Sequence, residues 1–123
     1  NPFFPMALGT IAKHGTLDVP MPEGPDMFDY ADENRARGDL GEIGFSNIEV
    51  QALPMVSRSD DVNFLVDGLK YSTVRTKITL DAQTPEVREA IFADLAQQTE
   101  ALKTPEGDYA LAFHATCVCG QKP

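Results

Sequence analysis

The sequence is poor in basic residues, with 10 Lys and Arg side chains against 19 Asp and Glu and a net charge of −9. This balance disfavours binding to nucleic acid or to an anionic membrane, because phosphate groups are bound by clustered Lys and Arg side chains. No apolar run approaches the roughly 18 residues of a membrane-spanning helix, and no basic segment followed by an apolar one opens the chain. We therefore expect a cytoplasmic protein that binds neither nucleic acid nor membrane.

Cysteine is also scarce, since Cys117 and Cys119 are the only two. On a strand their side chains would point the same way from positions about 7 Å apart, which is poor geometry for a mutual disulfide. Two thiols without a further Cys or His pair fall short of a zinc site, and the acidic residues between positions 18 and 29 match no calcium-binding loop. We expect buried, reduced cysteines and no metal site.

What the chain does contain is enough apolar material for a folded core. At 123 residues and 42% hydrophobic content, it is expected to form one domain, residues 1–123. It begins at Asn1 rather than Met. This start leaves open that the chain belongs to a longer protein.

Five segments have the residue spacing of amphipathic helices. The expected helices begin near Phe4, Asp32, Ser59, Tyr71 and Thr84. Asp32 and Thr84 are good N-cap residues, and Ser59 with the two aspartates after it favours a further helix start. The segment 71–80 fits a helix or a strand, and we favour the helix.

Two segments are expected to be strands. In the first, 45–57, apolar and polar residues alternate after Gly44, which suits the left-handed position at the end of a helix whose Ala36, Leu40 and Ile43 share one face. Pro54 indicates an edge strand or a bulge. The second, 109–119, is apolar on both faces, as in a covered sheet.

Because a two-stranded ribbon is marginal in water, these strands call for partners. We predict an α/β or α+β fold in which helices pack on an antiparallel strand pair that completes a larger sheet. The partner would be an upstream segment of the same protein or a second copy of the chain. A proline-rich loop, 16–29, is expected to be either a functional lid or a stiffened surface crossover.

Several short segments together carry a family resemblance: 28–33, the helix end and glycine stop at 40–45, the strand start at 48–50, and 120–123. On these residues the sequence resembles the C-terminal half of a class I S-adenosylmethionine-dependent methyltransferase. In that family a helix ending in a Gly-Phe pair leads into the sixth strand, and a helical insertion follows. The seventh strand then returns antiparallel between the fifth and sixth strands.

The resemblance implies a parent enzyme that transfers a methyl group from S-adenosylmethionine to a small molecule. The family holds this cofactor with a glycine-rich turn after its first strand and an acidic residue after its second, and neither pattern occurs here. The cofactor-binding half would therefore lie upstream of Asn1, and this chain alone is expected to be inactive and to bind no cofactor. The alternative is a non-enzymatic α+β module for small-molecule binding or dimerisation.

Candidate site residues are few. His14, at the end of the first expected helix, could act as a general base, although a histidine stabilised by the helix dipole is the simpler interpretation. Aromatic and Met residues near the N-terminus could line an apolar substrate pocket, although each also fits ordinary core packing. The predicted substrate-binding residues are Phe3, Phe4, Met21 and Tyr30, and the wider set adds Met6, Met27 and Phe28.

Overall fold

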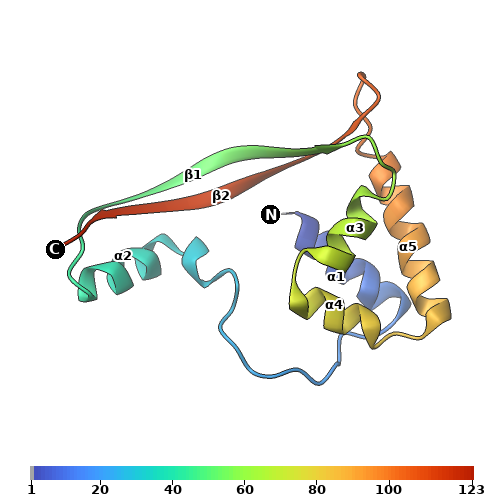
Figure 1. The fold of residues 1–123 in the computed structure, drawn as a ribbon, viewed down its shortest axis with the longest axis horizontal. Coiled ribbons are helices and arrows are strands. Elements are labelled where there is room, and N and C mark those ends of the chain that lie inside the picture. The colour runs from blue at the N-terminus through green and yellow to red at the C-terminus, as the bar shows by residue number, and fades with distance from the viewer. Residues whose placement is uncertain (1) are drawn as a thin grey trace. The chain divides into compact units, whose positions relative to one another are not determined.

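The computed structural model of the chain describes residues 2–123, which divide into two compact units. The first unit comprises the residues up to Met21 together with Val56–Phe113, and the second comprises Pro22–Met55 and His114–Pro123. Two antiparallel strands, β1 (Ser46–Ser59) and β2 (Tyr109–Gln121), form one sheet and contribute residues to both units (Figure 1). With five α-helices among the described residues, the fold is α+β, as predicted.

Four helices build the first unit. They are α1 (Phe3–His14), α3 (Phe64–Tyr71), α4 (Val74–Asp81) and α5 (Pro85–Glu100). Helix α3 packs on α5, α4 and α1, and α1 also packs on α5. The helix predicted for 71–80 is confirmed as α4, which Thr73 caps by accepting a hydrogen bond from the Thr76 amide at 3.1 Å.

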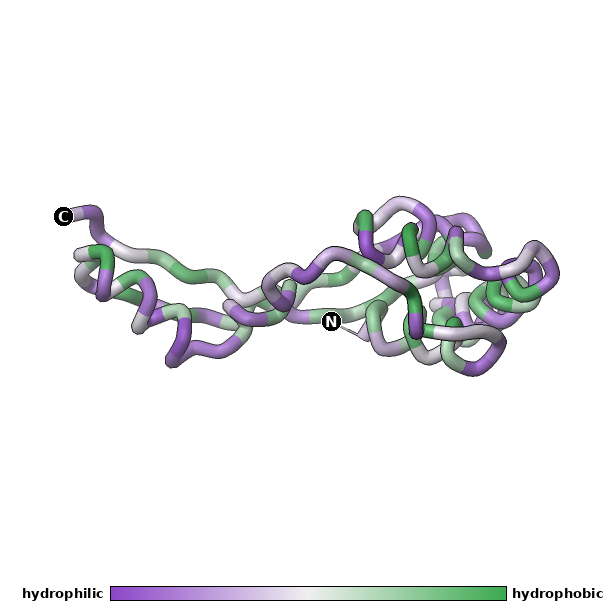
Figure 2. Tube along the Cα trace, turned by 90° about the horizontal axis from the view of Figure 1, so that it is seen from below, coloured by the Kyte–Doolittle hydropathy of each residue, from purple (hydrophilic) through white to green (hydrophobic). Residues whose placement is uncertain are grey.

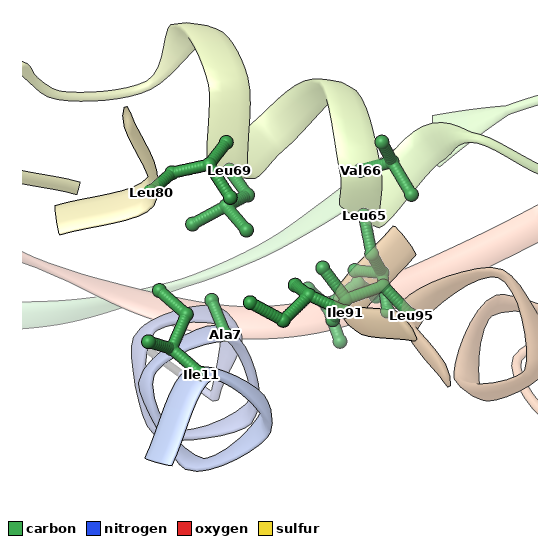
Figure 3. Close-up of a cluster of buried hydrophobic side chains, with 9 residues drawn as sticks. Ala7, Ile11, Leu65, Val66, Leu69, Leu80, Ile91 and Leu95 are labelled. Carbon is green, nitrogen blue, oxygen red and sulfur yellow. The ribbon is translucent and has the colours of Figure 1, made fainter. Parts of the chain in front are cut away.

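The core of the first unit is a single apolar cluster in which side chains from these four helices meet (Figure 3). Its buried members are Ala7, Ile11, Leu65, Val66, Leu69, Leu80, Ile91, Leu95 and Leu111. Burying a side chain the size of leucine or isoleucine stabilises a fold by about 1.5–3 kcal/mol. This cluster is therefore a major source of apolar stabilisation in the unit.

Of the three helix starts predicted from N-cap or acidic residues, those at Asp32 and Thr84 are confirmed. The Asp32 carboxylate accepts hydrogen bonds from the backbone amides of Asn34 and Arg35 at 2.8 and 3.2 Å. The Thr84 hydroxyl accepts one from a backbone amide in the first turn of α5. The predicted start near Ser59 is wrong, because α3 begins only at Phe64. There the Ser59 hydroxyl and the Asp61 carboxylate accept hydrogen bonds from amides two residues further on, so they build turns that precede the helix.

The second unit contains a short 3-10 helix, η1 (Asp29–Ala31), followed by α2 (Glu33–Glu42). Helix α2 ends in a Schellman turn: the Gly44 amide donates to the Gly41 carbonyl and the Phe45 amide to the Leu40 carbonyl, both at 3.0 Å. Gly44 has a φ of +94°, so the predicted left-handed glycine is confirmed. Ile43, which was predicted to share one face with Ala36 and Leu40, lies just past the helix end and is 66% exposed.

The strand predictions are confirmed in position but not in burial. β1 runs through Pro54 to Ser59, and a proline is tolerated because each strand of a two-stranded sheet has a free edge. β2 was predicted to be covered on both faces, which is wrong: Leu111 is buried, but Ala112 and His114 are exposed. Only one face of β2 contributes to the apolar core in the described residues.

The proline-rich segment is a loop up to Phe28, as predicted, and one buried side chain holds its first residue. The Gln83 amide group donates to the Thr16 carbonyl at 2.8 Å and accepts from the Thr16 amide at 3.1 Å. It donates a further bond to the Thr79 carbonyl at 2.8 Å. Gln83 thereby ties the start of the loop to the end of α4.

Hydrophilic and hydrophobic residues are intermixed along the trace (Figure 2). Within residues 2–123, none of the helices combines the length and the apolar character needed to cross a bilayer.

Candidate functional site

The first unit contains an apolar pocket with a cavity volume of about 230 Å³. Phenylalanine and leucine side chains from three elements contribute to its wall, among them Phe3 and Phe4 of α1, Phe64 of α3, and Leu111 of β2. The complete lining adds Ser57, Leu65, Gly68, Ser72 and Phe113. The structure thus brings together two of the four predicted substrate-binding residues, Phe3 and Phe4.

The two aromatic rings of α1 are held in a defined arrangement. Their centroids lie 5.2 Å apart with an interplanar angle of 73°, the edge-to-face geometry that aromatic pairs favour. The Phe3 ring lies directly on α3 at Gly68, where an added Cβ would come within 2.7 Å of it. The glycine therefore allows the ring to approach the helix backbone and close one wall of the pocket.

The pocket is suited to binding rather than to acid–base chemistry. None of its lining residues carries an ionisable side chain, and the hydroxyls of Ser57 and Ser72 are its polar side-chain groups. Ligand pockets of this kind combine mostly apolar walls with a few polar groups that orient the ligand. The arrangement fits a small, largely apolar molecule that forms one or two hydrogen bonds.

The other two predicted substrate-binding residues lie elsewhere. Met21 is half-buried in the loop, where its sulfur lies 4.0 Å from the Thr79 hydroxyl. Tyr30, in η1 of the second unit, is 56% exposed and donates to the Asp39 carboxylate at 3.0 Å. That hydrogen bond raises the pKa of the Tyr30 phenol. Neither residue lines the apolar pocket.

The wider set of aromatic and Met residues is also divided. Met6 packs against the core cluster, where it is half-buried. Met27 and Phe28 are 53% and 45% exposed in the second unit. None of the three lines the apolar pocket.

His14 belongs to a polar cluster around Asp94 of α5. Its Nε2 atom lies 2.7 Å from one carboxylate oxygen, which Lys13 Nζ also contacts at 2.7 Å, while Gln98 donates to the other oxygen at 2.9 Å. Hydrogen bonds from Lys13, Gln98 and His14 hold the pKa of Asp94 well below its usual range. His14 does not line the apolar pocket, and in this cluster its contacts join α1 to α5.

Seven residues of the pocket were not among the predicted site residues: Ser57, Phe64, Leu65, Gly68, Ser72, Leu111 and Phe113. Alternation along the second strand placed Leu111 and Phe113 on one face, so their shared orientation was available as a signal. The alternation does not indicate which helix packs against this face, because that depends on contacts between distant segments.

The two cysteines lie in the second unit and are free. Their Sγ atoms are 3.8 Å apart, beyond the roughly 2.05 Å of a disulfide bond. Cys119 is exposed and Cys117 half-buried, so the prediction of buried thiols is wrong: the end of β2 is not covered in the described residues. The hydrogen bond with Cys117 raises the pKa of the Cys119 thiol.

Comparison of the chain with protein-family models, with curated proteins and with solved structures finds no match. The apolar pocket and the edge of β2 away from β1, which has no strand partner in the described residues, are the structural features that bear on function.

Proposed function

We propose that this chain is the C-terminal, substrate-side region of an S-adenosylmethionine-dependent methyltransferase that acts on a small molecule. The observation that carries the proposal is the order of elements around the sheet. Helix α2 ends at Gly44 and leads through Phe45 into β1, the helices α3 to α5 follow, and β2 returns antiparallel to β1. This is the order of the last helix, the sixth strand, the helical insertion and the seventh strand in the family that the sequence resembles.

The edge of β2 away from β1 supports the same assignment. In the family, the seventh strand lies between the fifth and the sixth. β2 pairs with β1 on one edge, and its other edge has no strand partner within residues 2–123. Strand edges with unpaired backbone groups are templates for a further strand. Under the proposal, that edge receives the fifth strand of the cofactor-binding half of the same protein.

The apolar pocket supports the role on the acceptor side. Methyl transfer to a bound nucleophile depends on alignment of the two reactants and exclusion of water, which binding sites supply without a dedicated acid or base. The pocket offers Phe3, Phe4 and Phe64 as walls that exclude water from an apolar acceptor, and Ser57 as a group that can orient it. S-adenosylmethionine would supply the methyl group from the other half of the enzyme.

Titration calorimetry tests the proposal with two proteins: this chain, and a form extended at its N-terminus by the upstream coding sequence. We expect S-adenosylmethionine to bind the longer form only. Binding by neither form would contradict the proposal, and binding by this chain alone would contradict the assignment of the cofactor to the other half. In the longer form, Phe3→Leu should raise the KM for the acceptor and leave the cofactor Kd unchanged.

A second function is favoured by the exposed apolar residues of β1. Leu53, Met55 and Val56 are 38%, 46% and 57% exposed on a strand whose outer edge has no partner in the described residues. A second copy of the chain could pair with this edge and form an intermolecular sheet, which would make the protein a dimerisation module. Light scattering separates the two: a stable monomer that gains cofactor binding on extension supports the methyltransferase, whereas a dimer that never binds the cofactor supports the module.

A further inference from the structure

A second cavity, of about 290 Å³, lies on the first unit among α3, α4 and α5. It shares no lining residue with the apolar pocket. Its wall contains Lys70, Tyr71, Lys77, Leu80, Asp81, Arg88 and Phe92. Three of the ten basic residues of an acidic chain thus line one small cavity.

The basic residues of this cavity differ from most of the others in how they are paired. Elsewhere in the described residues, Lys13, Arg35, Arg37, Arg58 and Lys103 each form an ion pair with an acidic side chain. In the cavity only Lys77 does so, with Asp81 at 2.5 Å. Lys70 and Arg88 form no ion pair with an acidic side chain within residues 2–123, although Arg88 acts electrostatically on Glu86.

The remaining wall is apolar and aromatic. Leu80 is buried, and Phe92 is half-buried with its ring centroid 4.6 Å from the Lys70 ammonium. This cation–π contact places the Lys70 ammonium beside the aromatic part of the cavity wall. Tyr71 is 79% exposed at the margin, where its ring is available to a ligand. A molecule that enters the cavity meets cationic groups and an apolar surface together.

We propose that this cavity binds a small aryl phosphate monoester, with the phosphate on Lys70 and Arg88 and the ring against Phe92 and Leu80. Lysine and arginine are the side chains that proteins use to bind phosphate, and the arginine guanidinium matches its geometry in a bidentate manner. With Asp81 offsetting Lys77, the cavity keeps about two positive charges. A phosphate monoester carries about −1.5 to −2 at pH 7, so the charges match.

The size of the cavity agrees with this ligand class. With a volume of about 290 Å³, the cavity is larger than the space that one or a few waters require, so it has room for a small organic ligand. An aryl ring with one phosphate group is a ligand of this kind. The negative charge of the chain as a whole repels anions, so an aryl phosphate that binds does so through these local cations.

Titration calorimetry with phenyl phosphate tests the proposal on the whole chain, with inorganic phosphate and phenol as the two halves of the ligand. We expect saturable binding of phenyl phosphate at a 1:1 ratio, and binding at least about tenfold weaker for either half. Arg88→Gln and Lys70→Gln keep much of each aliphatic stem and should each weaken binding about tenfold. Asp81→Asn should strengthen it, because it removes the one anionic group of the wall.

Lys122→Gln is the matched control, since it makes the same change in net charge at an exposed residue of the second unit. It should leave the affinity for phenyl phosphate unchanged. Absence of saturable binding would overturn the proposal, and so would a Lys122→Gln effect as large as that of Arg88→Gln. Equal affinity for inorganic phosphate would overturn the role of Phe92 and Leu80. Circular dichroism of each variant separates lost binding from lost folding, and none of these outcomes depends on methyl transfer.

Discussion

Replacing Gly44 with alanine tests whether one left-handed residue determines where α2 ends. Gly44 has a φ of +94°, and a Cβ added there would lie 3.3 Å from Cγ of Pro123. An L-residue in the left-handed region costs about 1–2 kcal/mol, whereas the stiffer unfolded chain of an alanine variant returns about 0.4–1 kcal/mol. We expect Gly44→Ala to lower the free energy of unfolding of the second unit by about 1 kcal/mol.

Gly38→Ala is a matched comparison in the same helix. Gly38 lies within α2, and a Cβ added there meets no atom within 4 Å. Alanine in an exposed helix interior is favoured over glycine by about 1 kcal/mol. The same chemical change should therefore stabilise at one position and destabilise at the other, a difference of about 2 kcal/mol.

Hydrogen exchange of the Phe45 amide is the most direct assay, since that amide donates to the Leu40 carbonyl across the turn at 3.0 Å. A loss of about 1 kcal/mol corresponds to roughly fivefold faster exchange in Gly44→Ala. Gly38→Ala should slow it by a similar factor. If both variants shift the rate in the same direction, or if Gly44→Ala leaves it unchanged, the left-handed turn does not control the helix end.

Three further outcomes follow from buried or paired side chains. Gln83→Leu should lower stability by about 1–3 kcal/mol, because it removes the partners of the Thr16 backbone; unchanged exchange of the Thr16 amide would refute this. The pKa of Asp94 is lowered on folding by hydrogen bonds from lysine, glutamine and histidine, so its contribution is present above pH 3.8 and is lost as pH falls through the folded-state pKa. Asp94→Asn should therefore lower the free energy of unfolding at pH 7, and by progressively less as the pH falls. A difference between wild type and variant that stays constant with pH would contradict this. Leu95→Ala, at a fully buried position, should cost about 2–5 kcal/mol in urea unfolding, against about 1 kcal/mol for Leu53→Ala at a position of β1 that is 38% exposed.

Features set by neighbouring residues could be predicted from the sequence. The caps at Asp32 and Thr84 and the glycine stop at Gly44 each depend on a few consecutive residues, and all three occur as expected. The start of α3 was missed for a related reason. Asp61 can either cap a helix or build a turn, and in both arrangements its carboxylate accepts a hydrogen bond from the Asn63 backbone amide.

Features set by distant contacts could not be predicted. The apolar pocket joins α1, α3 and β2, and nothing local to Phe3 indicates that its ring lies on Gly68. The cationic cavity was missed because Lys70 and Arg88 come from helices whose packing the pattern of single segments does not define. The contact between His14 and Asp94 likewise joins residues 80 positions apart, so no local pattern indicates it.

The first unit is assembled from two stretches of chain that the segment Pro22–Met55 separates, and this has a consequence for folding and ligand binding. Helices α3, α4 and α5 follow one another and can associate early, whereas α1 must close a long loop before it docks, which is entropically costly. Docking of α1 is therefore expected to be late in folding and early to reverse in partial unfolding. Because α1 carries Phe3 and Phe4, the apolar pocket exists only while α1 is docked, and a molecule bound there would also clamp this helix in place by mass action.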